Sequence, residues 1–383
     1  MESVCNHIEN MEDVYIMPSE LIQKISSDSV IDSAYEWLCK RRKGYSHNDE
    51  VWDIRFRWSE FKPYLQKALL RGEYDISSQI VIMTPERRTE LWSAKDALVL
   101  KAISIVLGEH LKPVLSHNCY HLAGNGGAKA AVRATARYLK QGQHVMKSDV
   151  KGYYANIDHK ILFNILHKYV PDRLVQNLLW QYLRRTVYCD GSYRDVKRGI
   201  SLGCPLSPLM GALYLKQLDD CMERTGLFYA RFMDDWVVIA PTRWKLRSAV
   251  RIVNETLNLL KVEQHPDKTF IGRVDRGFDF LGYFMKPGVL KVSRGTFERF
   301  TERISRLYEQ GADYLRIEEY VKHWFKWVRS GIGAWINKKE NESIKKHPHP
   351  SANEECRCLY VEAINCLAMI CFLFTPASHF CAC

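Results

Sequence analysis

Apolar residues recur at helical spacing in several stretches of the chain. Between Leu91 and Leu111 the pattern is nearly continuous and predicts a buried helix. Two later stretches are amphipathic and predict a pair of surface helices. Residues 1–40 also have a mixed pattern that favours helix. The apolar positions are Leu98, Val99, Ala102, Ile103, Val106 and Leu107 in the first helix, Phe297, Phe300, Ile304 and Leu307 in the second, and Ile317, Val321, Trp324 and Val328 in the third.

Shorter apolar runs predict the strands of a central sheet. His144–Val150, Phe228–Phe232 and Trp236–Ala240 each have the length and composition of a core strand. The sequence Met-Asp-Asp at 233–235 separates the last two runs, so this pair predicts a hairpin with an acidic tip. Gly277–Tyr283 predicts a further strand bounded by glycines.

Glycine and proline mark the turns between these elements. His265–Thr269 predicts a turn that leads into a strand. Arg198–Leu215 opens as a turn-rich loop and becomes an apolar helix after Pro208. His121–Lys129 is glycine-rich and precedes a helical run through Tyr138. Such a turn can present backbone N–H groups to a phosphate, but a plain turn before a packed helix is equally consistent. It is not a P-loop, because it lacks the Gly-Lys-Ser/Thr sequence.

Paired carboxylates at a hairpin tip are the main chemical signal. Asp234 and Asp235 concentrate negative charge, which divalent cations would make tolerable. Asp149 lies near the end of another predicted strand, His144–Val150, and supplies a third carboxylate, completing an oxygen-ligand site for two Mg²⁺ ions. Two such ions, about 3.5–4 Å apart, are the apparatus for transferring phosphoryl or nucleotidyl groups.

Charge points to a polyanionic partner. The 383 residues carry a net charge of +11, which favours such a partner without naming it. Lys40–Lys43, Arg55–Trp58 and Arg184-Arg185 are local basic clusters, for which a solvated surface is the alternative. The two amphipathic helices also carry basic positions, which could line a nucleic-acid channel or simply face solvent. These positions are Arg299, Arg303, Arg306, Lys322, Lys326 and Arg329.

Both ends of the chain bear on its cellular context. The first residues lack the basic start and apolar run of a signal peptide, so a cytoplasmic location and mostly reduced cysteines are expected. Residues 338–350 predict a linker, and the following tail holds half of the twelve cysteines. No Cys-x-x-Cys pair occurs, so a zinc site is disfavoured. Leu359–Phe374 is too short to span a bilayer and favours a docking or oligomerisation helix.

From about Trp92 to Ser330 the motifs, in this order and spacing, resemble the reverse transcriptase family, in particular its bacterial group II intron-like branch. The resemblance implies an α+β right-hand polymerase fold with fingers, a palm with an antiparallel sheet, and a helical thumb. The implied parts are an N-terminal helical extension at 1–40, fingers at 41–143, a palm at 144–290, a thumb at 291–337, and a linker with a Cys-rich tail at 338–383.

The resemblance assigns roles to the acidic motifs and their neighbours. It implies that Asp149, Asp234 and Asp235 are catalytic and hold two Mg²⁺ ions, or Mn²⁺ in their place, with Val150 as a further ligand. Tyr154 stands at the steric-gate position, where a ring beneath the sugar would exclude a 2′-hydroxyl. Tyr153 is the expected core partner. The residues implied in dNTP binding are Tyr154, Lys268, Leu202 and Gly203. Those implied in template or primer binding are Arg198, Gly199, Phe232, Met233, Phe278, Leu281 and Gly282.

The sequence departs from the family at several positions. Leu202 stands where the family usually has Gln, and Ala212 where it has Asn, which puts nucleotide contacts in question but leaves metal ligation untouched. Arg87 and Arg88 occupy the region of the family's Arg-Pro triphosphate signature. Asp158 resembles the structural end of the first acidic motif and is expected to cap a helix.

The expected function is RNA-directed DNA synthesis by two-metal catalysis. The chain looks most like the defence-associated bacterial enzymes, which act against phage with a dedicated non-coding RNA. Expected partners are dNTPs, a structured non-coding RNA and an RNA/DNA hybrid, with a homo-oligomer or a partner defence protein as further options and no membrane. The alternatives are template-independent or protein-primed synthesis by the same site, and a catalytically silent relic that binds RNA or protein.

Overall fold

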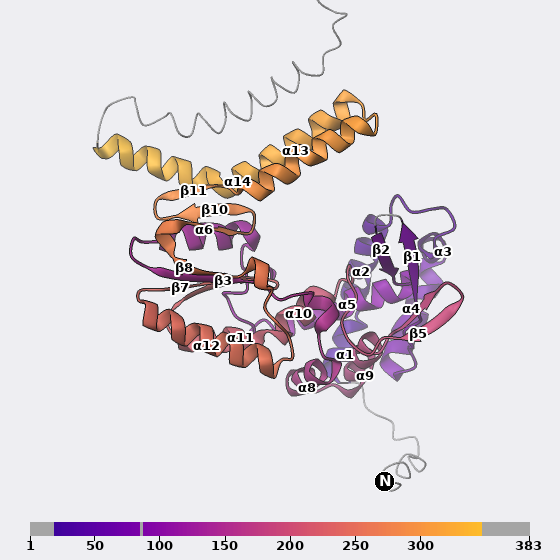
Figure 1. Ribbon diagram of the computed structural model, residues 1–383. Helices are drawn as coiled ribbons and strands as arrows, with labels where there is room; N and C mark the ends of the chain where they lie inside the picture. The colour runs from indigo at the N-terminus through magenta and orange to yellow at the C-terminus, as the bar shows by residue number, and fades with distance from the viewer. Residues whose placement is uncertain (1–18, 85–86, 347–383) are drawn as a thin grey trace, which may run out of the picture. The chain divides into compact units, whose positions relative to one another are not determined.

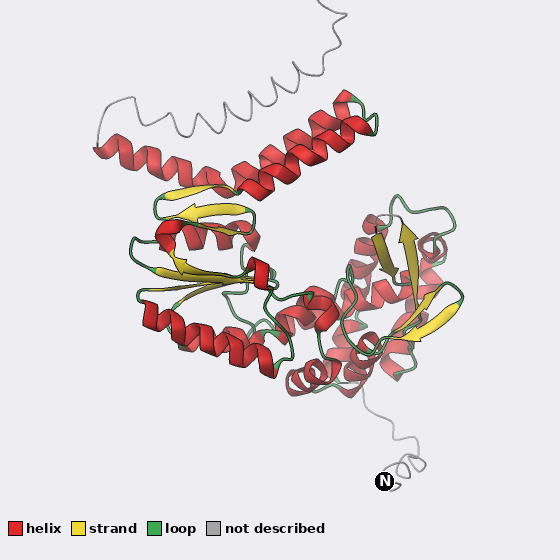
Figure 2. Cartoon of the chain, in the orientation of Figure 1, coloured by secondary structure: helices red, strands yellow, loops and turns green. Residues whose placement is uncertain are grey.

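The computed structural model describes residues 19–84 and 87–346, which form a mixture of helices and strands (Figures 1 and 2). The chain divides into two compact units, Met1–Arg306 and Leu307–Cys383. The start of the expected N-terminal extension and the whole Cys-rich tail lie outside the described residues. Within those residues, no helix is both long and apolar enough to cross a membrane.

The first helices pack around one buried helix. They are α1 (Glu20–Ile25), α2 (Asp28–Arg41), α3 (Glu50–Phe56) and α4 (Trp58–Arg71). The buried helix is α5 (Ala94–His110), against which α1, α2 and α3 pack. Since α5 has buried residues on every side, it is a core helix, as the apolar pattern predicted. The helical prediction for residues 1–40 is confirmed from Glu20 onward.

A small sheet joins distant parts of the chain, with strand order β2-β1-β4-β5. Its strands are β1 (Gln79–Thr84), β2 (Arg87–Leu91), β4 (Thr186–Cys189) and β5 (Ser192–Asp195). The helices α8 (His159–Tyr169) and α9 (Arg173–Leu183) precede β4. The pairing of β1 with β4 is parallel, whereas the other pairs are antiparallel.

Two of the predicted basic clusters contribute arginines to the interior. Arg185 is buried and donates hydrogen bonds to Gln79 and to the carbonyl of Gly199. Arg42 is also buried, where it pairs with Asp49 and donates to the Trp92 carbonyl. Buried charges need such partners. These two arginines therefore stabilise the fold and are not part of a solvated basic surface.

The central sheet is antiparallel throughout, with strand order β6-β7-β3-β8. Its strands are β3 (His144–Ser148), β6 (Phe228–Phe232), β7 (Asp235–Ala240) and β8 (Phe270–Arg273). The helices α11 (Lys216–Arg224) and α12 (Arg243–Leu259) cover one face and α6 (Gly127–Tyr138) the other (Figure 1). The three predicted core strands and the helix after Pro208, α10 (Ser207–Tyr214), are confirmed.

The strand predicted within Gly277–Tyr283 is confirmed, but it is short and a turn follows it inside the same segment. This segment contains β9 (Phe278–Phe280), a two-residue turn, and the start of β10 (Tyr283–Lys286), which then pairs with β11 (Val289–Val292). The turn residues Leu281 and Gly282 have φ values of 49° and 84°. Left-handed values at both positions are typical of a type I′ hairpin turn. The sequence Leu-Gly lacks the usual Asn-Gly signal, so the pattern concealed the turn.

The last two helices are α13 (Arg294–Glu309) and α14 (Tyr314–Lys346). Both are amphipathic as predicted, with Phe300 and Ile304 buried in α13 and Ile317 and Val321 buried in α14. The basic positions named for both helices are exposed. The predicted linker is wrong up to Lys346, because α14 continues that far. Lys and Glu favour helix, and no proline or glycine interrupts this stretch before Pro348.

Candidate active site

A hairpin and its neighbouring strand bring the three aspartates to one edge of the central sheet. In the β6–β7 hairpin Phe232 pairs with Asp235, so Met233 and Asp234 form a two-residue turn. In the β3–β7 pair Ser148 lies opposite Trp236. The residue after Ser148 is Asp149, which antiparallel geometry places beside Asp235. The predicted hairpin is therefore confirmed, and residues about 85 positions apart in the chain share one edge.

The site is acidic, and lysines partly neutralise it. Asp149 is only 3% exposed; its Oδ2 accepts a hydrogen bond of 2.6 Å from Lys268 Nζ. Lys147 Nζ lies 3.7 Å from Asp235 Oδ1. Burial, together with repulsion from Asp149, raises the pKa of Asp234. Burial also raises the pKa of Asp235 to about 6, and the charges of Asp234 and Asp149 add to this effect. The site therefore holds more negative charge than its lysines relieve.

The residues present fit a divalent cation in one definite respect. Asp149 Oδ1 is buried and accepts no hydrogen bond in the structure, an arrangement that is costly without a partner. A metal ion is a partner that a carboxylate oxygen commonly takes. Among residues 19–84 and 87–346, however, no three acidic, imidazole or thiol groups converge as a ready-made metal cluster. Val150, the further predicted ligand, is buried directly after Asp149.

Two residues that the sequence reasoning missed hold the Met-Asp-Asp turn. The Met233 N–H donates to His121 Nδ1 at 2.9 Å, and its carbonyl accepts from Arg231 Nη1 at 2.7 Å. Arg231 is fully buried and forms an ion pair with the equally buried Asp219. In the sequence, His121 stands in a glycine-rich turn, and nothing local connects it with the Met-Asp-Asp turn. A polar residue on an otherwise apolar strand was the available signal for Arg231.

Tyr154 lies in α7 (Tyr153–Asn156), five residues after Asp149. It is half-buried, and burial raises the pKa of its phenol to about 12, so the hydroxyl stays protonated at neutral pH. A Cβ on Gly211 would lie 2.9 Å from Tyr154 Cε1, so the ring packs closely on the glycine of α10. Tyr153 is buried and donates a hydrogen bond to the Gly211 carbonyl, which confirms the predicted core role.

The segment before α10 is docked on the turn that carries Tyr154. Arg198 donates to the carbonyls of Asn156 at 3.1 Å and Lys261 at 2.9 Å. Gly199 has φ +86°, and a Cβ there would lie 2.8 Å from the Ala155 carbonyl oxygen. Arg198 and Gly199, predicted to bind template or primer, thus have clear structural roles. Leu202 is 63% exposed. Gly203, beside it, is exposed with φ +82°.

The remaining predicted contact residues have different environments. Phe232 ends β6, and its ring meets the His121 ring edge-on with centroids 6.0 Å apart. Phe278 is 4% exposed and stacks against Phe270, so its ring is packed among buried residues. Leu281 and Gly282 form the turn described above.

Two other sequence expectations concern Asp158 and the pair Arg87 and Arg88. Asp158 accepts hydrogen bonds from the N–H groups of Lys160 and Ile161, which confirms the predicted helix cap on α8. Arg87 and Arg88 lie on β2, but their side chains are outside the described residues.

Residues 96–285 match the protein family described as "Reverse transcriptase (RNA-dependent DNA polymerase)". This part of the chain is a reverse transcriptase domain. The matched range begins in α5 and ends in β10, and it contains Asp149, Tyr154, the Met-Asp-Asp turn and Lys268. The predicted resemblance to reverse transcriptases is thereby confirmed for the domain.

Several curated proteins are similar to parts of this chain. The chain is 22% identical over 169 residues to the group II intron-encoded protein LtrA of Lactococcus lactis subsp. cremoris, a match that covers 44% of this chain and 28% of the relative. It is 22% identical over 271 residues to the protein YkfC of Escherichia coli strain K12, covering 57% of this chain and 69% of that protein. A putative COX1/OXI3 intron 2 protein of Saccharomyces cerevisiae is 22% identical over 163 residues, or 39% of this chain and 19% of its own length. The match with this chain therefore spans only 28% of the length of LtrA and 19% of the length of the yeast relative.

Proposed function

We propose that this protein is an RNA-directed DNA polymerase that adds deoxynucleotides to a primer 3′-hydroxyl. The observation that carries the proposal is the placement of Asp149 beside the Asp234-Asp235 hairpin within a reverse transcriptase domain. In this proposal residues 41–143 are the fingers, 144–290 the palm and 291–337 the thumb.

In the proposed site the three aspartates hold two Mg²⁺ ions, or Mn²⁺ in their place. When bound, these ions would activate the 3′-hydroxyl and stabilise charge on the triphosphate and the leaving pyrophosphate. The unpartnered, buried Oδ1 of Asp149 supports its role as a ligand. Burial raises the pKa values of Asp234 and Asp235, and the neighbouring carboxylates add to the rise; a bound cation would relieve that repulsion.

Two further side chains would act on the nucleotide. The Lys268 ammonium is half-exposed and reaches the acidic edge, so it can pair with the triphosphate once a cation replaces it at Asp149. The half-buried Tyr154 ring is neutral and rigidly seated on Gly211, properties that suit a gate against the 2′-hydroxyl. The proposed nucleotide site therefore combines the partly exposed ammonium of Lys268 with the closely packed ring of Tyr154.

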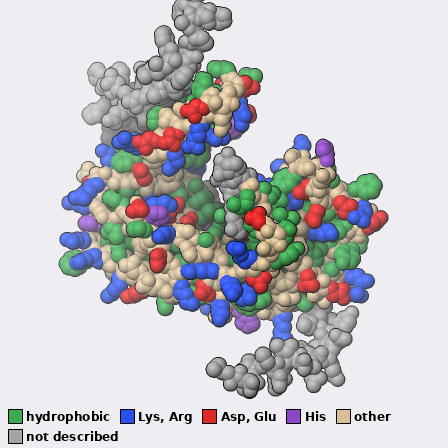
Figure 3. Space-filling view, turned by 45° about the vertical axis from the view of Figure 1, so that its right-hand side comes forward, with side chains coloured by type: hydrophobic (Ala, Val, Ile, Leu, Met, Phe, Trp, Pro, Cys, Tyr) green, Lys and Arg blue, Asp and Glu red, His purple; other side chains and the backbone are tan. Residues whose placement is uncertain are grey.

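We extend the proposal to biology on the sequence resemblance alone. The protein would act in bacterial antiphage defence, with a structured non-coding RNA as template or scaffold. Lys and Arg side chains are dispersed among acidic ones over the face shown in Figure 3.

The test is incorporation of labelled dNTP by purified protein with Mg²⁺ and an RNA template annealed to a DNA primer. The wild type should extend the primer, whereas replacement of both Asp234 and Asp235 with Ala should reduce incorporation below detection. Asp220→Asn is the matched control, because Asp220 lies on α11 and pairs with Lys216. Extension by the double Ala variant at the wild-type rate would refute the proposal.

A second candidate activity is synthesis without an added template. It is favoured by Leu202, an exposed apolar side chain where the family usually has a nucleotide-contacting Gln. Products made from dNTPs alone, sensitive to the same double Ala variant, would support this activity. Strict dependence on added template would exclude it.

A further inference from the structure

The Met-Asp-Asp turn has a backbone conformation that its own sequence does not favour. Met233 has φ +56°, in the left-handed region. This conformation costs a residue with a side chain about 1–2 kcal/mol. Such a conformation persists only when the surrounding structure imposes it. In the described structure, the groups that bond the peptide N–H and carbonyl of Met233 are His121 and Arg231.

The hydrogen bonds of His121 define the protonation of its ring. Nδ1 lies 2.9 Å from the Met233 nitrogen and 3.3 Å from Cys119 Sγ, both of which can donate. Nε2 lies 3.1 Å from the Pro208 carbonyl oxygen, which can only accept. Nδ1 must therefore be the unprotonated acceptor and Nε2–H the donor. A doubly protonated ring would lose the bond to Met233.

The polypeptide around His121 fixes where its ring lies. Arg231 N–H donates to the Asn118 carbonyl, and Tyr120 N–H donates to the Arg231 carbonyl. Residues 118–120 thus run beside β6 as an extra bridge outside the named strands. At its other nitrogen, His121 bonds the first turn of α10, the helix whose Gly211 seats Tyr154. One imidazole therefore links the acidic turn to the helix beneath the proposed nucleotide gate.

We propose that His121 is a positioning residue that holds the Met233 peptide and thereby sets the place of Asp234 at the metal-binding edge. The inference rests on the proposed polymerase function for its kinetic consequence. The hydrogen bond itself can be tested without activity. His121 contacts no substrate in this account and acts only through the turn.

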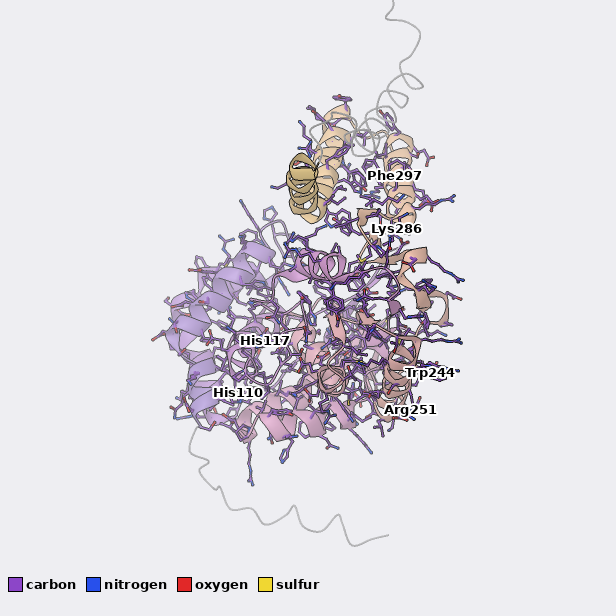
Figure 4. All side chains as sticks on the ribbon, turned by 90° about the vertical axis from the view of Figure 1, so that its left-hand side faces the viewer. His110, His117, Trp244, Arg251, Lys286 and Phe297 are labelled. Atoms are coloured by element: carbon purple, nitrogen blue, oxygen red, sulfur yellow. The ribbon has the colours of Figure 1, made fainter. Side chains whose placement is uncertain are left out.

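The experiment compares three variants that remove one or both of the hydrogen bonds made by the His121 ring. In His121→Asn the amide oxygen can replace Nδ1 as acceptor for Met233. In His121→Gln the amide can replace Nε2–H as donor to Pro208, leaving Met233 without its acceptor, and His121→Ala removes both bonds. His117→Ala is the matched control, because His117 lies in the same loop and is exposed (Figure 4).

The variants should differ from one another in kcat but not in their affinity for nucleic acid. Misplacing a catalytic group by about 1 Å can cost on the order of 100-fold in rate. We expect kcat to fall about 10- to 100-fold in the Gln and Ala variants and the Mg²⁺ requirement to rise, while His121→Asn stays within about 10-fold of wild type. Affinity for primer–template measured without Mg²⁺ should not change.

Amide hydrogen exchange provides the readout that does not depend on activity. Protection of the Met233 N–H should be kept in the Asn variant and lost in the Gln and Ala variants, each measured under conditions well below its own unfolding midpoint. Unchanged Met233 protection and kcat in the Gln and Ala variants would overturn the inference. A different outcome is that the Gln and Ala variants lose Met233 protection as expected while the wild type incorporates no dNTP. That outcome would refute the proposed function and leave the hydrogen-bonded link supported.

Discussion

At the scale of single residues, the site depends on side chains that touch no substrate. The Tyr154 ring packs closely on Gly211, and His121 and Arg231 hydrogen-bond the N–H and the carbonyl of Met233. Tyr154 and the aspartates could be named from the sequence because each stands in a local motif. Their supports could not be named, because His121 is about 110 positions from the turn it bonds. No local pattern encodes such a contact.

Replacing Gly211 with Ala tests the seat of Tyr154. The added methyl would lie 2.9 Å from Tyr154 Cε1 and 3.3 Å from Tyr153 Cε1, so the Tyr154 ring must shift. We expect selection of dNTP over rNTP, measured as the ratio of the kcat/KM values, to change at least several-fold. Gly108→Ala is the control, since that glycine lies in α5 with nothing within 4 Å and its replacement should stabilise the helix by up to about 1 kcal/mol. Identical discrimination in both variants would contradict the seating role.

Because the His121 ring is neutral in the folded protein, we expect the protein to lose stability at acid pH. Burial, with the nearby Arg231 charge, lowers the pKa of His121 from 6.5 to about 4. Between these values the unfolded chain binds a proton that the folded chain does not, so this contribution to stability falls as pH drops from about 6.5 to about 4. Chemical unfolding of wild type and His121→Asn over this range measures it. The difference in stability between the two should shrink toward acid pH; a constant difference would argue against a neutral ring.

At the scale of elements, the apolar pattern predicted most of the helices and core strands, and turn chemistry set its limits. β3, β6, β7 and α5 agree with their predictions because each is a largely buried, mostly apolar run with the length of a strand or a helix. The β9–β10 hairpin was missed because Leu281 has a left-handed conformation that leucine rarely adopts. The end of α14 was missed because a run of charged residues resembles a linker, although Lys and Glu are good helix formers.

The β9–β10 turn offers a test that separates stability from primer binding. Leu281→Asn should relieve the left-handed strain at φ 49° and raise the free energy of unfolding by about 0.5–1 kcal/mol. If Leu281 also contacts the primer, the variant should make shorter products at each binding event. Denaturant unfolding and a trapped-extension assay measure the two effects. A less stable variant would contradict the turn assignment.

At the scale of the whole molecule, net charge is the sequence feature that most constrains the partner. The chain carries +11, but Arg42 and Arg185 are buried and serve the fold. Composition does not distinguish buried from exposed arginines. Only the structure shows that these two do not contribute to a surface that could bind nucleic acid. The remaining charge still predicts an electrostatic share in nucleic-acid affinity.

Affinity for an RNA/DNA hybrid should therefore fall with ionic strength. A protein that makes six phosphate contacts loses about 1,000-fold in affinity between 50 and 200 mM salt. We expect a clear linear decline of log affinity with log salt concentration, measured by fluorescence anisotropy. The buried Arg42 should contribute nothing to the slope, whereas the exposed Lys326 on α14 is expected to contribute. Salt-independent binding would contradict an electrostatic interface.

The central claim is that Asp149 and the Asp234-Asp235 turn together hold divalent cations. Anomalous diffraction from crystals of the protein with Mn²⁺, primer–template and a non-hydrolysable dNTP analogue tests it most directly. The account predicts anomalous peaks within about 2.5 Å of carboxylate oxygens of Asp149 and Asp234. Ordered nucleotide with no anomalous peak at these carboxylates, or with Mn²⁺ bound only elsewhere, would contradict it.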